Sequence, residues 1–380
     1  MKILIIRNFP NYMDVRNATY NIQELGLALA LSRRNHRVGL VLWTDGEEES
    51  FLYKSGCAEV MIYYRKAIVF LKNGFYKDIN SIIDQYDIIQ MAEYNQFQVW
   101  QYAKKYSSKL VIYHGQYYGK INRKYNMMCR VFDLFGLHRY RKNNTLFITK
   151  SQLSKQYLVD RKIMEDNVVA VGVGLNPGAF CCDTENPLTD FCNQFRNQEI
   201  NILYVGNFAV RRHLEFIGDV VKKLNEEGHK ANFVIVGGKN TPYGEQCWKY
   251  FQEQGIMPYV YYAEKAEQKH MGMVYQSSDF LLFPAEYEIF GMVLLEAMYF
   301  GTIVISATNG GSCTLIQDGE NGFIKDNLDI EEWCQLILEV NGNRNTKVSI
   351  KQKAHETICH RFTWDALAEK FEKVYLRRLS

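Results

Sequence analysis

The sequence lacks the marks of several common protein classes. Its nine cysteines include no Cys-x-x-Cys pair and have no clustered histidines beside them, which argues against a disulfide framework and against a zinc site. No uninterrupted apolar stretch approaches the length that spans a membrane, and the apolar segment at residues 3–6 is too short for a secretory leader. We therefore expect a cytoplasmic protein, either in solution or bound peripherally to the inner face of a membrane.

Two cofactor motifs are also missing. The first apolar strand, at residues 3–6, is not followed by the Gly-x-Gly-x-x-Gly turn with which a dinucleotide oxidoreductase holds its pyrophosphate. No cluster of aspartates has the arrangement that binds a divalent cation. The sequence thus predicts neither a resident cofactor nor a metal site.

Short apolar runs alternate with helical patterns along the chain, which is typical of a parallel α/β sheet. With 380 residues, 47% of them hydrophobic, the chain can bury two cores of ordinary size. We expect a first domain at 1–175, a linker at 176–199, a second domain at 200–360 and a C-terminal helix at 361–380. The expected strands are 3–6, 37–42, 88–91, 110–113, 146–148 and 168–171 in the first domain, and 200–205, 233–236, 260–262, 280–283 and 303–306 in the second.

The most specific chemical pattern begins at residues 280–283. Four apolar residues there suit a buried parallel strand, and Pro284 ends it. Gly291 then opens a run of apolar residues at helical spacing. The free amides of Gly291, Met292 and Val293 would point back over the strand ends, where they favour an anionic diphosphate.

Two glutamates flank this helix start. Glu288 lies in the loop before the helix and Glu296 lies inside it, at most about 12 Å away at the helical rise. That spacing is too wide for sharing a proton, but it suits hydroxyl groups at opposite ends of a ligand whose middle is a diphosphate. A nucleotide sugar has this shape, with its ribose at Glu296 and its hexose at Glu288.

The pattern resembles the signature of the glycosyltransferases of family four, which have the GT-B fold. The matching positions are Glu288, Phe290, Gly291, Glu296, Gly301, Gly310 and Gly311, continued by Asp318, Gly319 and Gly322. The resemblance implies two Rossmann-like parallel-sheet domains facing an interdomain cleft, and a retaining mechanism that uses a nucleotide sugar. It also implies that the helix at 361–380 packs back on the first domain, although packing on the second domain would leave the same apolar stripe.

The resemblance assigns donor contacts to further residues of the second domain. After the strand at 200–205 the family usually has Gly-Arg and then a lysine, whereas this chain has Gly206, Asn207 and Arg212. Arg212 can bridge two phosphate oxygens, and Arg211 could compensate for the arginine missing at position 207. Gly237 fits a loop near the nucleotide or an ordinary turn. The predicted donor contacts are Gly206, Asn207, Arg211, Arg212, Gly237, Phe290, Gly291, Met292, Val293 and Glu296.

Acceptor contacts are predicted in the first domain. His114 ends the strand at 110–113, where the family has a histidine beside the transferred sugar, although a single histidine is more often structural. Most members have a Gly-Gly loop after the first strand, whereas here Asn21 and Gln23 offer amides to an acceptor, and Asn21 suits a helix cap. The predicted acceptor side is Asn21, Gln23 and His114, and the predicted catalytic residues are His114, Glu288 and Arg212.

Positive charge is concentrated in one segment. Residues 101–150 hold 11 Lys and Arg against a single acid, Asp133. Within residues 120–142 these basic side chains alternate with apolar ones, which is the composition of a basic amphipathic helix on an anionic bilayer. A solvated basic face on an ordinary core helix fits the pattern equally well. Nucleic acid is disfavoured as a partner because no recognised reader motif accompanies the segment.

The sequence leads to one functional hypothesis with two alternatives. It is a metal-independent retaining hexosyltransferase that moves a sugar from a UDP- or GDP-sugar to a glycan or lipid-linked acceptor, in cell-surface polysaccharide or glycoconjugate synthesis. Positive potential around the departing diphosphate and a held acceptor hydroxyl suffice for this chemistry. A sugar-nucleotide epimerase would instead convert the donor without an acceptor, and a non-catalytic nucleotide-sugar-binding protein would bind the donor without turnover.

Overall fold

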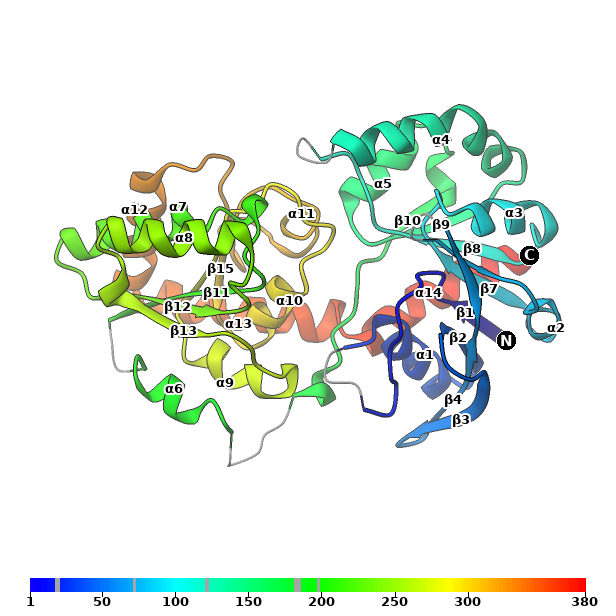
Figure 1. The fold of residues 1–380 in the computed structure, drawn as a ribbon, viewed down its shortest axis with the longest axis horizontal. Helices are drawn as coiled ribbons and strands as arrows, with labels where there is room; N and C mark the ends of the chain where they lie inside the picture. The colour runs from blue at the N-terminus through cyan, green and yellow to red at the C-terminus, as the bar shows by residue number, and fades with distance from the viewer. Residues whose placement is uncertain (18–20, 71–72, 120–122, 181–185, 197–198) are drawn as a thin grey trace. The chain divides into compact units, whose positions relative to one another are not determined.

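The computed structural model describes residues 1–380 except 18–20, 71–72, 120–122, 181–185 and 197–198 (Figure 1). The chain divides into two compact units. Unit 1 comprises Met1–Asn176 and Thr363–Ser380, and unit 2 comprises Pro177–Phe362. The segment expected as a linker therefore belongs to unit 2 from Pro177 onward, and it contains a short helix, α6 (Thr189–Asn193).

Unit 1 is built on an eight-stranded sheet with the order β10-β9-β8-β7-β1-β2-β4-β3, in which only the pair of β3 and β4 is antiparallel. The central strands β1, β7 and β8 are buried at nearly every position, as in a parallel sheet covered on both faces. The strands are β1 (Lys2–Ile6), β2 (Arg37–Trp43), β3 (Glu49–Ser55), β4 (Ala58–Arg65), β7 (Ile88–Ala92), β8 (Leu110–His114), β9 (Leu146–Thr149) and β10 (Val168–Ala170).

In the described residues of unit 1, a separate antiparallel hairpin and six α-helices accompany this sheet. The hairpin consists of β5 (Ala67–Phe70) and β6 (Asn73–Tyr76), and the sequence did not predict it. The basic segment forms one long helix, α4, as its composition indicated. The helices are α1 (Gln23–Arg33), α2 (Asn80–Ile83), α3 (Phe97–Lys105), α4 (Arg123–Lys142), α5 (Gln152–Val159) and α14 (Trp364–Leu379).

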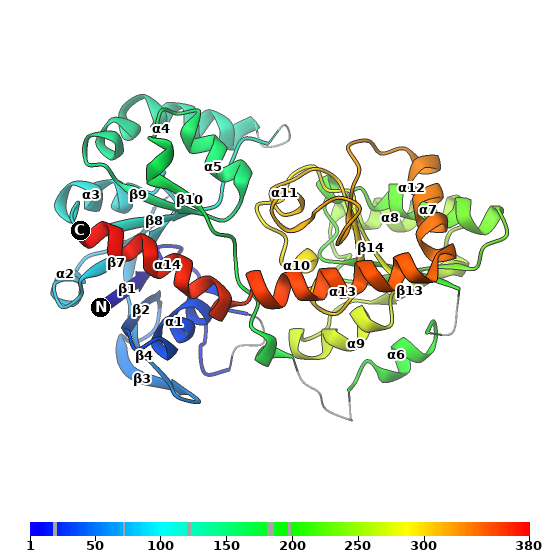
Figure 2. The ribbon, with the colours of Figure 1, turned by 180° about the vertical axis from the view of Figure 1, so that it is seen from behind.

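The C-terminal helix α14 is part of unit 1, and Figure 2 shows it in red beside α1. Thr363 caps the helix, because its side chain accepts a hydrogen bond from the amide of Ala366 at 3.2 Å. The buried indole of Trp364 lies against Gly26 of α1 and Gly174, where added Cβ atoms would come within 2.3 and 2.4 Å of the ring. Gly26 and Gly174 thus form a slot for the Trp364 indole, and this contact attaches α14 to the rest of unit 1.

Unit 2 is built on a six-stranded sheet with the order β13-β12-β11-β14-β15-β16, and every neighbouring pair is parallel. Its strands are β11 (Ile200–Val205), β12 (Ala231–Val236), β13 (Val260–Ala263), β14 (Phe280–Phe283), β15 (Ile303–Ser306) and β16 (Phe323–Ile324). Its other helices are α7 (Leu214–Glu226), α8 (Pro242–Glu253), α9 (Met271–Gln276), α10 (Met292–Tyr299), α11 (Ser312–Leu315), α12 (Ile330–Gly342) and α13 (Arg344–Arg361).

The two units confirm the predicted fold class of Rossmann-like parallel sheets. Each predicted strand is present, and the largest shift of a bound is two residues, at the start of β12. Short apolar runs in the sequence identify these strands because a buried parallel strand is apolar at nearly every position. Within the described ranges, no helix is both long enough and apolar enough to cross a bilayer.

Candidate functional site

The loop between β14 and α10 is held in a tight backbone arrangement. Gly291 is the N-cap of α10 and has a φ of 76°, a left-handed conformation that other residues rarely adopt. A Cβ on Gly311 would lie 1.9 Å from the carbonyl oxygen of Phe290, and one on Gly310 would lie 2.3 Å from a neighbouring carbonyl. Gly310 also donates its amide to the carbonyl of Glu288 at 2.9 Å. These glycines therefore fix the loop that carries Glu288.

The first turn of α10 presents backbone donors. The amides of Leu294 and Leu295 bond to the carbonyl of Gly291, at 3.0 and 3.3 Å. Across the part of the chain that the structure describes, no acceptor is recorded for the amides of Met292 and Val293. Together with the helix dipole, such donors attract an anion. This is the arrangement expected for a diphosphate site, and ligand binding there remains a prediction.

Glu288 pairs with both predicted arginines. Its Oε2 accepts hydrogen bonds from Nη1 of Arg211 at 3.1 Å and from Nη2 of Arg212 at 2.8 Å. Nη1 of Arg211 also donates to the carbonyl of Tyr287 at 2.9 Å. Both arginines lie in the 3-10 turn η3 (Val210–Arg212), which follows β11. The structure thus brings together three charged residues that the sequence assigned to the same ligand.

Arg212 is the more buried of the two arginines. Its side chain is 13% exposed and its guanidinium carbon lies 4.6 Å from the centre of the Phe283 ring. Burial lowers the pKa of Arg212, while Glu288 acts in the opposite direction, and an arginine stays protonated in either case. Its Nη1 is buried and has no hydrogen-bond partner among the described residues. A buried cationic donor without an acceptor favours an anionic ligand.

Two of the predicted glycines lie at strand ends beside this cluster, where the backbone requires glycine. Gly206 follows β11 with a φ of 138°, and Gly237 follows β12 with a φ of 152°. A Cβ on Gly237 would lie 2.0 Å from the carbonyl oxygen of Gly206, so only glycine allows this approach. Asn207 is exposed, and its carbonyl accepts a hydrogen bond from the hydroxyl of Tyr204 at 2.8 Å.

Glu296 lies in a more enclosed place than the sequence predicted. Nε2 of Gln268 donates to its Oε1 at 2.6 Å, and the hydroxyl of Tyr275 donates to its Oε2 at 2.7 Å. The side chain is buried, and burial raises the pKa of Glu296 to about 7 against the lowering effect of these hydrogen bonds. Glu296 thus links α10 to α9, and its contact with a ribose remains a prediction.

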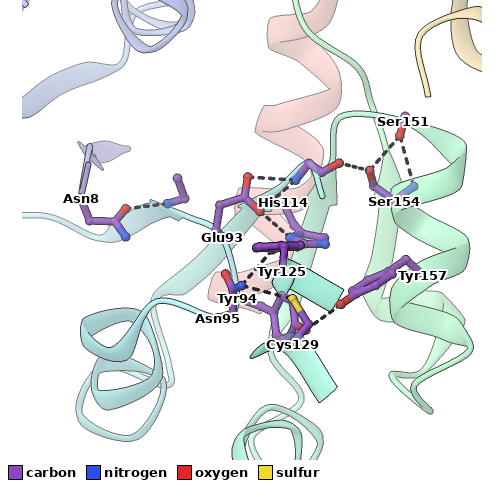
Figure 3. Close-up of polar contacts among 12 residues, drawn as sticks. Asn8, Glu93, Tyr94, Asn95, His114, Tyr125, Cys129, Ser151, Ser154 and Tyr157 are labelled. Carbon is purple, nitrogen blue, oxygen red and sulfur yellow. Dashed lines mark hydrogen bonds and ion pairs between the residues drawn. The ribbon is translucent and has the colours of Figure 1, made fainter. Parts of the chain in front are cut away.

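His114 ends β8 in unit 1 and is completely buried. Its Nδ1 lies 2.7 Å from Oε2 of Glu93, as Figure 3 shows. Glu93 follows β7 with a φ of 62°, and its carboxylate also accepts the amide of Gly115 at 3.2 Å. Burial alone would raise the pKa of Glu93, but the adjacent imidazole lowers it below its ordinary value. This carboxylate therefore holds the imidazole in a fixed orientation.

The other ring nitrogen of His114, Nε2, is a candidate for contact with a ligand. Nε2 is buried and has no hydrogen-bond partner within the described ranges. The ring of Tyr94 meets the imidazole edge-on at 5.1 Å, and the Tyr94 hydroxyl bonds to Tyr157 at 2.8 Å and to Asp133 at 2.7 Å. Figure 3 shows these aromatic side chains around the histidine. Native structures pair most buried polar atoms, so an unpaired imidazole nitrogen favours a ligand contact.

The start of α1 differs from the prediction. The N-cap of α1 is Ile22, and no side chain caps the helix, so the predicted cap at Asn21 is wrong. Asn21 lies before the cap and Gln23 is the first helical residue, and both are half-buried. Their predicted contact with an acceptor remains a prediction.

The sequence reasoning missed Glu93 as a partner of His114. One signal was present, because Glu93 directly follows β7 and His114 ends the adjacent β8, so both lie at the carboxyl edge of the sheet. The partners of Glu296 had no comparable signal, because Gln268 and Tyr275 reach it from another helix. Within the described residues, no group of three or more His, Cys, Asp and Glu side chains could hold a metal ion.

Comparison with known proteins finds similarity to sugar-transferring enzymes. Residues 188–357 match the model of the family described as glycosyl transferases group 1. A sulfoquinovosyl transferase of Arabidopsis thaliana is 29% identical over 195 residues, which cover 47% of this chain and 36% of that protein. An uncharacterized glycosyltransferase of Methanocaldococcus jannaschii is 28% identical over 221 residues, covering 56% of this chain and 54% of that protein. This chain thus spans between about a third and about half of those two relatives.

Solved structures share the whole fold at low sequence identity. A glycosyltransferase from Rickettsia africae superposes with a TM-score of 0.75 at 16% identity, covering 100% of this chain and 99% of that one. HepE from Anabaena, solved with UDP and glucose, superposes with a TM-score of 0.69 at 14% identity, covering 99% and 100%. The family model thus matches most of unit 2, and the chain as a whole has the fold of these solved structures, the GT-B fold.

Proposed function

We propose that this protein transfers a sugar from a UDP- or GDP-sugar to a glycan or lipid-linked acceptor with retention of anomeric configuration. The observation that carries the proposal is the cluster in unit 2 where Arg211, Arg212 and Glu288 lie beside the start of α10. The Anabaena structure solved with UDP-glucose is of the same fold, which supports a nucleotide sugar as the donor.

The cluster offers separate contacts for the parts of such a donor. The two arginines and the amides of Met292 and Val293 would bind the diphosphate, which carries more negative charge than one carboxylate and so competes with Glu288 for Arg212. Glu288, released from Arg212, would then accept hydrogen bonds from sugar hydroxyls. These positive charges also support the proposal that the leaving group requires no divalent cation.

The proposed reaction needs no nucleophile from the protein. The acceptor oxygen forms a bond to the anomeric carbon on the face that the diphosphate leaves, while the bond from that carbon to the phosphate oxygen breaks. The acceptor proton passes to the departing phosphate oxygen, and the products are the glycosylated acceptor and a nucleoside diphosphate. Arg212 and the helix amides stabilise the charge that develops on the leaving oxygen.

His114 is the proposed acceptor-side residue. The carboxylate of Glu93, 2.7 Å from Nδ1, would accept a hydrogen bond from an Nδ1–H, which leaves Nε2 to bond with a hydroxyl of the sugar or of the acceptor. Because the imidazole is buried beneath tyrosine rings, a hydroxyl would reach it after those rings shift. The role of Glu93 is therefore to position His114.

The proposed location is the cytoplasmic face of a membrane, in the synthesis of a cell-surface polysaccharide or glycoconjugate. Helix α4 supports this, because its exposed basic residues include Arg123, Arg130, Arg141 and Lys142. Its acid, Asp133, is paired with Arg161 at 2.6 Å. A positively charged helix face is attracted to anionic lipid headgroups.

A donor-panel assay tests the proposal. Nucleotide release from UDP- and GDP-sugars is measured for the wild type, Glu288→Ala and Glu296→Ala, with and without a chelator. We expect turnover of at least one donor, a large loss in both variants and no effect of the chelator. Unchanged turnover in both variants would defeat the site assignment. Conversion of the donor to another sugar nucleotide would indicate an epimerase, and donor binding without any product would indicate a binding protein.

A further inference from the structure

Buried polar atoms without a hydrogen-bond partner gather at one edge of the unit 1 sheet. Asn8 follows β1, Gln96 lies in the loop after β7, and His114 ends β8. These strands are neighbours in the order β8-β7-β1, so the three residues lie together along the carboxyl edge of the sheet. Native proteins pair most of their buried polar atoms, and parallel sheets bind ligands at this edge. The cluster therefore indicates a binding site.

Asn8 supplies a hydrogen-bond donor. Its side chain is completely buried, and its Oδ1 accepts the backbone amide of Ala92, the last residue of β7, at 3.3 Å. Because an amide N–H bonds to the oxygen of this side chain, the contact fixes which end of the side-chain amide is the nitrogen. That nitrogen, Nδ2, is buried and has no partner among the residues that the structure describes.

Gln96 supplies a hydrogen-bond acceptor. It is the N-cap of α3, but its side chain makes no capping hydrogen bond. The side chain is 8% exposed, and its Oε1 is buried without a partner in the described part of the chain. Gln98 is buried to a similar degree, yet it accepts the amide of Tyr76 at 3.1 Å and donates to the Tyr76 carbonyl at 2.8 Å. Gln98 thus has a structural role that Gln96 lacks.

The spacing of the site suits one sugar ring. Strand β7 separates the strands that carry Asn8 and His114, so their backbones lie about 10 Å apart. Figure 3 shows the two side chains on either side of Glu93. A single pyranose ring that makes one hydrogen bond to each side chain can bridge this span.

The chemistry of the site favours an uncharged sugar. A hydroxyl group both donates and accepts hydrogen bonds, so it can satisfy side-chain amides and an imidazole alike. A phosphate or carboxylate on the ligand would approach the buried carboxylate of Glu93 and be repelled. Three basic side chains near this edge are engaged in other contacts: Arg7 pairs with Glu24 at 2.5 Å, Arg161 pairs with Asp133 at 2.6 Å, and Lys150 lies over the ring of Tyr113 at 5.0 Å.

We propose that Asn8 and Gln96, together with His114, form a subsite for one uncharged sugar ring of the acceptor. Nδ2 of Asn8 donates to one hydroxyl oxygen, and Oε1 of Gln96 accepts a hydrogen bond from another hydroxyl. The sugar reaches these atoms after neighbouring side chains shift, and the new hydrogen bonds offset the cost of unpaired buried groups in the free protein. This inference rests on the proposed function and specifies its acceptor, which presents a neutral sugar whatever carries that sugar.

Acceptor kinetics with defined probes test the subsite. Nucleotide release at saturating donor is measured with methyl glycosides of glucose, galactose, mannose and N-acetylglucosamine, and with glucose 6-phosphate and methyl glucuronide. We expect at least one neutral glycoside to raise the rate above that without acceptor, with kcat/KM at least tenfold higher than for either anionic probe. Asn8→Ala and Gln96→Met should each raise KM for that glycoside about tenfold, with KM for the donor unchanged.

Gln98→Met is the matched control. It removes the two hydrogen bonds to Tyr76, so we expect a lower melting temperature and an unchanged KM for the glycoside. Gln96→Met should instead keep or raise the melting temperature, because it replaces an unpaired buried group by an apolar one of similar size. It also keeps the test decisive should Asn8→Ala fail to fold.

An unchanged KM for the glycoside in a folded Asn8→Ala or in Gln96→Met would overturn the inference. Preference for an anionic probe, or the same loss of melting temperature in Gln96→Met and Gln98→Met, would overturn it too. A wild type that releases nucleotide but responds to no glycoside also overturns it and leaves the proposed function intact. Absence of nucleotide release from every donor would defeat the proposed function, and the inference with it.

Discussion

Glu296 shows how burial changes the chemistry of a single residue. A carboxyl whose pKa is about 7 is largely neutral below that pH, and its two hydrogen bonds tie α9 to α10. The free energy of unfolding therefore depends on pH through this group. Because the folded pKa lies above the ordinary value of 4.5, the unfolded chain releases the proton first as pH rises. The contribution of Glu296 to native stability is therefore greatest below about pH 4.5, falls as pH rises toward 7, and levels off above 7.

Glu296→Gln should remove this part of the pH dependence. The wild type is expected to lose on the order of 3 kcal/mol of unfolding free energy between pH 4.5 and 7 from this group. Denaturant unfolding at several pH values measures the loss. An identical pH profile in Glu296→Gln would show that the carboxyl is not held neutral. Glu59→Gln, at an exposed acid paired with Lys54, is the control.

Glu93→Gln tests whether this carboxylate positions His114. Gln can still accept the amide of Gly115, but its neutral side chain accepts a weaker hydrogen bond from Nδ1 of His114 than a carboxylate does. We expect kcat/KM for the acceptor to fall about ten- to hundredfold, while KM for the donor stays unchanged. A purely structural role would instead lower the apparent kcat through loss of folded protein and leave KM for the acceptor unchanged.

The same variant has a predicted effect on stability. The pKa of Glu93 is lowered in the folded state, so the pair stabilises the protein above the unfolded pKa of about 4.5, and this stabilisation is lost as pH falls through the lower folded value. At neutral pH the variant should lose on the order of 3 kcal/mol, as when a buried pair loses one partner. The difference from the wild type should shrink in acid, and a constant difference would contradict the pairing.

Single residues were predictable where local spacing carries the signal. Glu288 and Gly291 lie at fixed offsets from the end of β14, and the resemblance to the family signature added Arg212 to the same cluster. Glu93 and His114 are 21 positions apart and meet because β7 and β8 are neighbours, which requires the strand order. The burial of Glu296 depends on α9, and no spacing within α10 indicates it.

At the scale of elements, the loop with Gly310 and Gly311 supports the loop that bears Glu288. Gly311→Ala places a methyl group 1.9 Å from the carbonyl oxygen of Phe290, so the backbone must move. We expect a loss of about 3 kcal/mol in unfolding free energy, together with loss of donor binding. Thermal unfolding and donor titration measure these effects. Gly342→Ala is the control, since an added Cβ there meets nothing within 4 Å, and equal behaviour of the two variants would contradict the role of Gly311.

Elements were predictable where their pattern was simple. Parallel strands such as β14 are unbroken apolar runs between turns, and most of them were predicted, whereas β4, with its mixed sequence, and the two-residue β16 were missed. The β3 strand was missed because it is largely exposed at the edge of the sheet and pairs antiparallel with β4, so its sequence is mixed. The β5–β6 hairpin was missed because its apolar residues face outward, where the sequence pattern of burial gives no guide.

At the scale of the molecule, unit 1 is completed by the end of the chain. Trp364→Ala would leave a cavity in the slot formed by Gly26 and Gly174, and we expect unit 1 to lose about 4 kcal/mol of stability. Hydrogen exchange should show faster opening in α1 and unchanged protection in α7 of unit 2. Leu379→Ala, at a half-exposed position on the same helix, is the control. Equal loss of protection in both units would contradict a discontinuous unit 1.

The sequence predicted two sheets because two series of apolar strands were separated by a segment without periodicity. It did not settle where the last helix packs, because an amphipathic stripe fits either unit. Contact with α1 and the buried hydrogen bond from Tyr375 to Gln90 decide this in favour of unit 1.

Calorimetric titration of UDP and GDP into the wild type and Arg212→Ala tests the central claim, that the start of α10 and its arginines bind the diphosphate of a nucleotide sugar. We predict that at least one of the two nucleotides binds the wild type, and that it binds Arg212→Ala about ten- to hundredfold more weakly. Arg196→Ala, at an arginine that contacts Ser277, should bind like the wild type. Binding of neither nucleotide, or equal affinity in the wild type and Arg212→Ala, would contradict the claim.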